Sequence, residues 1–105
     1  MTGLSFREFY DALYYGADIE FTLEKWHYMI YCGWENTSEG KFHCIEIVKS
    51  DQPFYEQAAA PHVWDTIFES KMKDGNENIQ SFLKATLFEN RSFCEVEPAV
   101  VIEYS

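Results

Sequence analysis

The sequence has few basic residues and no long apolar run. Only 8 residues are Lys or Arg, against 18 that are Asp or Glu, and the formal net charge is −10. Proteins bind nucleic-acid phosphates and anionic membranes mainly through Lys and Arg, so direct binding to either is not expected. No apolar run approaches the roughly 18 residues needed to span a bilayer. We therefore expect a protein away from the membrane, whose charged partners would be basic.

Cysteine is also scarce. The three cysteines are odd in number and show no CxxC spacing, which argues against a disulfide framework and favours a reducing compartment. The N-terminus has no basic segment followed by an apolar one, as a secretion signal would have. These features predict a cytoplasmic protein.

The chain is rich in apolar and aromatic residues. Hydrophobic residues make up 47% of it and aromatic residues 18%. A chain of this length and composition can bury a core without disulfides or metals, and we find no linker or repeat. A single compact domain over residues 1–105 is predicted.

The period of the apolar residues predicts an α+β fold. Ser5 and Glu8 have the spacing of a capping box, and a helical period follows as far as Gly16. The period then falls to two and returns to a helical one near Asn78. We expect two helices packed on an antiparallel sheet of three to five strands. The predicted helices are 5–15 and 78–89, the predicted strands are 18–23, 26–34 and 41–49, and the pattern allows two more strands at 62–69 and 99–104.

The segment CGWENTSEGKFHC, residues 32–44, brings two thiols and an imidazole toward one turn. If Leu23 pairs with Trp26, then Cys32 faces the core, with His43 as a cross-strand neighbour and Cys44 on the opposite face. Two ligands are fewer than the four of a structural zinc site. We predict no metal and no cofactor; should a metal bind, its ligands would be Cys32, His43 and Cys44.

No catalytic motif is visible. Catalysis needs a nucleophile with its base, two carboxylates in different environments, or a complete metal set, and the sequence offers none of these. The three histidines are expected at the surface or at the boundary of the core, and Cys94 is expected to be a small buried residue. The chain is predicted not to be an enzyme.

Acidic residues near loops are the candidates for partner binding, because they can reach a partner without disturbing the core. The alternative is that each is an ordinary solvated acid. The predicted partner-binding residues are Glu35, Glu39, Asp74 and Glu77, with Tyr31 as an aromatic contact. Tyr31 belongs to a row on the non-core side of the first hairpin, which either contacts a partner or is covered by the second helix. That row is Glu20, Thr22, His27, Met29 and Tyr31.

Two stretches resemble a known family: FREFYDALYYGADIEF at 6–21 and SFLKATLFENRSFCEVE at 81–97. Both are similar to segments of small, uncharacterised acidic proteins from Gram-positive gut bacteria and their mobile elements. Cys94 stands where that family tends to have Trp, and Ala17 where it often has His. The family has no known activity, so the resemblance implies a fold and a genomic setting.

Together these features favour a non-enzymatic, anti-CRISPR-like inhibitor from a phage or mobile element. Its partner would be a larger basic host protein, a nucleic-acid-guided nuclease, whose DNA-binding surface it would block. One alternative is an immunity or antitoxin protein that neutralises a basic toxin. The other is a small metal-binding protein or an enzyme of unknown reaction.

Overall fold

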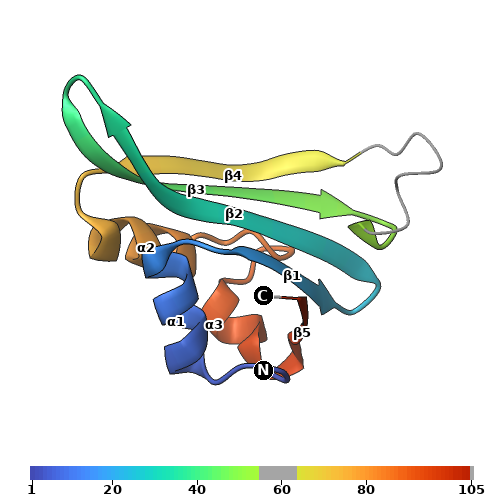
Figure 1. Ribbon diagram of the computed structural model, residues 1–105. Coiled ribbons are helices and arrows are strands. Elements are labelled where there is room, and N and C mark those ends of the chain that lie inside the picture. Colours follow the sequence, from blue (N-terminus) through green and yellow to red (C-terminus); the bar gives the residue numbers. More distant parts are fainter. Residues whose placement is uncertain (55–63, 105) are drawn as a thin grey trace.

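The computed structural model describes residues 1–54 and 64–104, which form one five-stranded antiparallel sheet and several helices (Figure 1). Along the sheet the strand order is β4-β3-β2-β1-β5. The elements are α1 (Phe6–Tyr15), β1 (Asp18–Leu23), β2 (Trp26–Thr37), β3 (Gly40–Ser50), β4 (Asp65–Met72), α2 (Gly75–Lys84), α3 (Phe93–Val96), the 3₁₀ helix η2 (Glu97–Ala99) and β5 (Val101–Tyr104). The predicted α+β class is confirmed.

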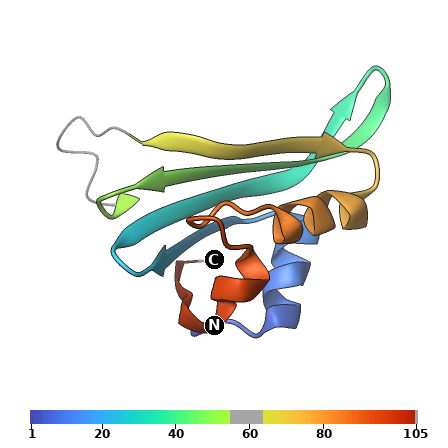
Figure 2. The same ribbon diagram turned by 180° about the vertical axis from the view of Figure 1, so that it is seen from behind.

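The helices all lie on one side of the sheet, as the two opposite views show (Figures 1 and 2). We call the side that they cover the inner face and the other side the outer face. The core is formed between the inner face and the helices, with stacked rings such as Phe9 on Phe93 at 4.7 Å and Phe21 on Tyr28 at 4.9 Å. The second helix therefore does not cover the outward row of the first hairpin.

α1 begins and ends where the sequence predicts. The Glu8 amide donates to Ser5 Oγ at 3.1 Å and the Ser5 amide donates to Glu8 Oε1 at 3.0 Å, which completes the capping box. Gly16 ends the helix with φ 106°, a conformation that favours glycine. Phe9 and Leu13 are fully buried, so the apolar stripe faces the core.

The first hairpin has the predicted register. Leu23 pairs with Trp26 and Phe21 with Tyr28, which places the apolar rows on the inner face. β2 and β3 are longer than predicted, because their pairing continues to the Thr37–Gly40 turn. Gly40 has φ 121°, and the Thr37 hydroxyl donates to the Gly40 carbonyl at 2.8 Å, so this turn carries its own closing contacts.

The second helix lies earlier in the sequence than the predicted range 78–89. α2 starts at Gly75 because the Asp74 side chain caps it, accepting from the Glu77 amide at 3.0 Å. The helix ends at Lys84, since Ala85 already has extended backbone angles. Asn90 has a left-handed backbone with φ 65°, in the turn that follows the helix.

The two optional strands both exist with shifted bounds. The strand predicted at 62–69 is β4, Asp65–Met72, and residues 62 and 63 lie outside the described residues. The strand predicted at 99–104 is β5, Val101–Tyr104, because η2 occupies Glu97–Ala99. Among the described residues, no helix is long and apolar enough to cross a membrane.

Candidate functional site

The thiol and imidazole of the 32–44 segment bind the C-terminal end of α1. His43 Nε2 lies 2.6 Å from the Leu13 carbonyl oxygen, and Trp34 Nε1 donates to the Tyr14 carbonyl at 2.7 Å. The Cys32 thiol donates to the Ala17 carbonyl, with the sulfur 3.0 Å from the oxygen. The last carbonyls of a helix have no partner within the helix, so side chains from β2 and β3 supply these donors. The cluster is a helix cap.

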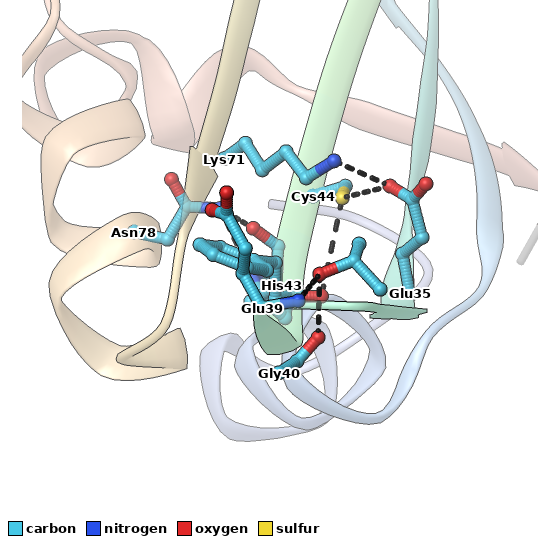
Figure 3. Close-up of polar contacts among 9 residues, drawn as sticks. Glu35, Glu39, Gly40, His43, Cys44, Lys71 and Asn78 are labelled. Carbon is cyan, nitrogen blue, oxygen red and sulfur yellow. Dashed lines mark hydrogen bonds and ion pairs between the residues drawn. The ribbon is translucent and has the colours of Figure 1, made fainter.

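His43 is fully buried, and the prediction that it lies at the surface or boundary is wrong. Because a carbonyl only accepts, Nε2 carries the proton that goes to Leu13, and Nδ1 accepts from Asn78 Nδ2 at 3.0 Å. The same Asn78 amide donates to the His43 carbonyl at 2.8 Å (Figure 3). Both ring nitrogens are thus engaged within the protein.

The three cysteines are free, and their surroundings differ. Burial raises the pKa of the Cys32 thiol to about 11, so at neutral pH it stays protonated. Cys44 lies on the outer face, as predicted, where partial burial and then Glu35 raise its pKa. Cys94 is exposed, which corrects the prediction of a buried residue. The environments of Cys32 and Cys44 therefore disfavour the thiolate that nucleophilic or metal-binding cysteines need.

Cys32 and His43 lie on the same face of neighbouring strands, as predicted, but they do not stand directly opposite each other. Cys32 pairs with Ile45, and His43 pairs with Trp34. Cys44 points to the opposite face, so it does not join them. Within residues 1–54 and 64–104, no group of three His, Cys, Asp or Glu side chains is placed to hold a metal ion. That no metal binds stays a prediction.

The outer face carries a row of acidic residues across four strands. Asp18 on β1 pairs with Tyr31 on β2, Tyr31 with Glu46 on β3, and Glu46 with Glu69 on β4. Side chains at paired positions point to the same side of a sheet, so these four lie in one line. We call Asp18, Glu46 and Glu69 the carboxylate row. It borders an open hollow of about 670 Å³ that also contains Glu35 and Lys71.

The carboxylate row has no cation of its own. Glu46 and Glu69 stand directly opposite each other, an arrangement that destabilises a sheet. The one ammonium that lines the hollow, Lys71, is 2.9 Å from Glu35, and this contact lowers the pKa of Glu35 (Figure 3). Among the described residues, no ion pair includes Asp18, Glu46 or Glu69. The hollow is therefore negatively charged.

The outer face of the first hairpin also has two buried polar atoms that lack partners among the described residues. Glu20 follows Asp18 by two residues on β1, so it is on the same face, and only 5% of it is exposed. Its Oε2 atom has no hydrogen-bond partner among the described residues, and neither does Nδ1 of His27. Buried polar atoms are rarely left unpaired. The outer face thus differs from a merely solvated surface.

The structure separates the predicted partner-binding residues into groups. Glu35 and Tyr31 line the hollow, and Glu39 is at the tip of the β2–β3 hairpin. Asp74 and Glu77 are at the start of α2, where Asp74 is the N-cap, so replacing it would disturb the helix. Only Glu35 and Tyr31 therefore share a surface with the carboxylate row. Whether any of the five binds a partner stays a prediction.

Sequence reasoning missed the carboxylate row itself. The alternation of β2 predicts that Tyr31 points outward, and this is confirmed. Asp18 and Glu69 were missed because each joins the row only through pairing, and the β3–β4 register shifts between Ile47 and Val48. Counting alternate outward positions along every strand would have found the acids but not their alignment.

Comparisons with protein-family models, curated proteins and solved structures found no match to this chain. The resemblance of residues 6–21 and 81–97 to small acidic proteins of mobile elements stays a prediction.

Proposed function

We propose that this protein is a non-enzymatic inhibitor that binds a larger basic protein through the outer face of its sheet. Its concrete partner would be a nucleic-acid-guided nuclease, as for an anti-CRISPR protein of a phage or mobile element. The observation that carries the proposal is the carboxylate row, an uncompensated line of negative charge on the sheet face that no helix of the described residues covers. Such a line suits a groove lined with Lys and Arg that normally holds nucleic-acid phosphates.

The carboxylate row lowers the stability of the isolated protein, and this supports a role in binding. A sheet gains from opposite charges or apolar residues at paired positions, yet Glu46 and Glu69 repel each other. Lys71 could have offset that repulsion, but it binds Glu35 instead. An arrangement that weakens the isolated protein and is relieved by a cation favours a surface used for binding.

Exposed tyrosines flank the acids. Tyr104 on β5 pairs with Glu20 and is 64% exposed, so it borders the same outer face. Tyr31 lies within the row and is half-buried. Tyrosine is common among the residues that dominate binding energy, because it buries a large rigid ring with a polar tip. The surface thus combines charge for attraction with aromatic rings for contact.

The three free cysteines and the dominance of acids suit a reducing cytoplasm, where such a nuclease acts. The immunity or antitoxin alternative would use the same surface against a basic toxin. No observation favours it over the nuclease, and the following experiment separates the two.

The test is a titration against a panel of purified RNA-guided nucleases, with target-DNA binding and cleavage as readouts. We expect inhibition that is complete at one inhibitor per nuclease and is competitive with DNA. The variant Asp18→Lys/Glu46→Lys/Glu69→Lys should lose at least tenfold in affinity, since each lysine turns attraction into repulsion. Binding should also weaken as the Debye length falls from about 10 Å at 0.1 M salt to about 3 Å at 1 M.

A matched control carries the same change in charge elsewhere. The variant Asp11→Lys/Asp51→Lys/Glu89→Lys replaces three exposed acids that lie outside the strands and outside the candidate residues, and it should keep most of the affinity. Equal losses in both variants would show that only net charge matters and would contradict the proposed surface. Neutralisation of a basic toxin, with no effect on any nuclease, would replace the nuclease with the alternative partner.

A further inference from the structure

Three carboxylates surround the Tyr31 side chain on the outer face. Asp18 pairs with Tyr31 on one side and Glu46 on the other, and Glu20 follows Asp18 on the same side of β1. The pKa of Tyr31 is raised, first by burial and then by Asp18, Glu46 and Glu20, so all three acids act on its hydroxyl. The Tyr31 side chain thus lies among three carboxylates.

Glu20 is the unusual member of these three acids. Only 5% of it is exposed, yet its Oε2 atom has no partner among the described residues. Burying a carboxylate oxygen without a hydrogen bond or counterion is costly, and perturbed groups of this kind gather at functional sites. Glu20 pairs with Met29, so it lies diagonally across from Tyr31 on the same face of the sheet, close enough to act on the Tyr31 hydroxyl.

Four cationic side chains make their contacts away from this site. Lys71 binds Glu35 and Arg91 binds Glu24, each through an ion pair. Lys49 lies 4.2 Å from the Trp26 ring, and Lys73 lies 5.6 Å from the Phe42 ring. Among the described residues, no ion pair includes Asp18, Glu20 or Glu46. The three acids are therefore open to a cation from another molecule.

We infer that the Tyr31 centre is a binding site for an arginine side chain of the partner, held between Asp18 and Glu46 over the Tyr31 ring, with Glu20 as the buried charge behind them. This inference rests on the proposed function and names the chemical group that the partner inserts. The hollow of about 670 Å³ has ample room for one guanidinium and its stem.

Arginine fits this geometry better than lysine. Its planar guanidinium presents a fork of donors that can serve two carboxylates at once, and its flat face stacks on an aromatic ring. Asp18 and Glu46 are on opposite sides of Tyr31, one strand spacing away in each direction, about 4.8 Å. A lysine ammonium is a compact, strongly hydrated charge and loses more hydration when it is placed in such a site.

The experiment uses the peptide acetyl-Gly-Arg-Gly-amide and its Lys counterpart as probes of the full-length protein, in low salt, with NMR and calorimetry as readouts. We expect the Arg peptide to shift the signals of Asp18, Tyr31 and Glu46 selectively, and to bind at least threefold more tightly than the Lys peptide. Glu20→Gln and Glu46→Gln should each weaken binding of the Arg peptide by about tenfold. Asp11→Asn, a matched change at an exposed acid on α1, should leave it unchanged.

Two further variants keep the test decisive. Tyr31→Phe keeps the ring but loses the hydroxyl, so it should retain most of the preference for arginine, whereas Tyr31→Ala should abolish it. If Glu20→Gln does not fold, the exposed edge of the site is still tested by Glu46→Gln. Equal binding of both peptides, or signal shifts spread over all surface acids, would overturn the inference.

The peptide experiment and the nuclease experiment can fail separately, so a failure of this site can be told from a failure of the proposed function. A nuclease that is inhibited through the carboxylate row, without selective binding of the Arg peptide at Tyr31, would keep the function and reject this site. Selective binding of the Arg peptide, with no nuclease inhibited, would keep the site and reject the function.

Discussion

The inner and outer faces of the sheet differ in how their facing polar groups are matched. On the inner face, His43 and Trp34 donate to carbonyls of the last turn of α1, Cys32 donates to the Ala17 carbonyl just after it, and Asn78 donates to the imidazole. On the outer face, Glu46 and Glu69 oppose each other. Each face also has two buried atoms without a partner among the described residues, which are Asn78 Oδ1 and Ser70 Oγ on the inner face and Glu20 Oε2 and His27 Nδ1 on the outer face. The difference between the faces is therefore the pair of like charges.

This contrast distinguishes a polar cluster that binds its own backbone from one that is open to a ligand. Cys32 and His43 drew attention by residue type, and the geometry shows that both bind backbone carbonyls of the same chain. The acids of the outer face have ordinary residue types and drew less attention, yet their partners are missing. A group whose hydrogen bonds are complete has little left to offer a ligand, whereas an unpaired one does.

The largest expected effect comes from removing the imidazole on the inner face. His43→Leu leaves the Leu13 carbonyl without its donor and removes one of the two acceptors of the Asn78 amide, while its bond to the backbone carbonyl of residue 43 stays; both losses are in the buried core. We expect the free energy of unfolding to fall by about 3 kcal/mol in urea denaturation, because buried groups lose their partners.

His27→Leu is the matched control for this change on the outer face. The atom that it removes, Nδ1, already lacks a partner, so the cost should be below about 1 kcal/mol. If His27→Leu costs as much as His43→Leu, the contrast between the faces is wrong.

The next effect is a loss of stability at high pH that originates from Cys32. Its pKa is raised by burial from 9.0 to about 11, so the unfolded thiol ionises first as pH rises. The stabilisation is thus complete below pH 9 and is lost toward pH 11. Between neutral pH and about pH 10.5 we expect wild type to lose of order 2 kcal/mol more than Cys32→Val.

The comparison with Cys32→Val cancels other titrations. The pKa of Tyr28, raised by burial to about 12, changes stability in both proteins alike. Parallel pH profiles for the two proteins would show that Cys32 ionises as easily in the folded state as in the unfolded state.

The inner face is also more crowded than the outer one, which a glycine substitution can test. A Cβ at Gly75 would sit 2.9 Å from Cζ2 of Trp34 and 3.0 Å from Cε2 of Tyr14. Glycine to alanine usually favours a helix, but here the rings would have to move, and we expect a loss of about 1–2 kcal/mol. In a Trp34→Leu background the loss should shrink, and thermal unfolding of the four proteins in this cycle measures the coupling. An unchanged loss in that background would mean that Trp34 does not crowd this position.

The inner face could be predicted from the sequence more fully than the outer one. The capping box at Ser5 and the β1–β2 register follow from local spacing, and both are present. The start of α2 was missed because Asp74 is equally typical of a turn and of an N-cap. The helix-capping role of His43 joins residues 30 positions apart in sequence, and local patterns cannot report such a contact.

The alignment of the carboxylate row was beyond prediction for a similar reason. β1 and β2 are joined by a two-residue turn that fixes their register, whereas β3 and β4 are separated by residues 51–64. A shift of one residue would turn Glu69 to the inner face. Only the observed pairing brings it opposite Glu46.

The smallest expected effect is the most informative about the outer face. Glu69→Lys places an ammonium opposite Glu46 and replaces repulsion with attraction, so the isolated protein should become more stable by about 0.5 kcal/mol. The gain should vanish in 1 M salt, where charges are screened within about 3 Å. Asp11→Lys makes the same change in net charge on α1 without an opposing carboxylate in the sheet, and it separates the local pair from the general charge. Denaturant unfolding of the three proteins at low and high salt measures both effects. A gain in stability that accompanies weaker partner binding would show that the outer face is unfavourable for stability because it serves binding. A loss of stability in Glu69→Lys would mean that Glu46 and Glu69 do not repel each other. That result would remove the main support for a binding surface here.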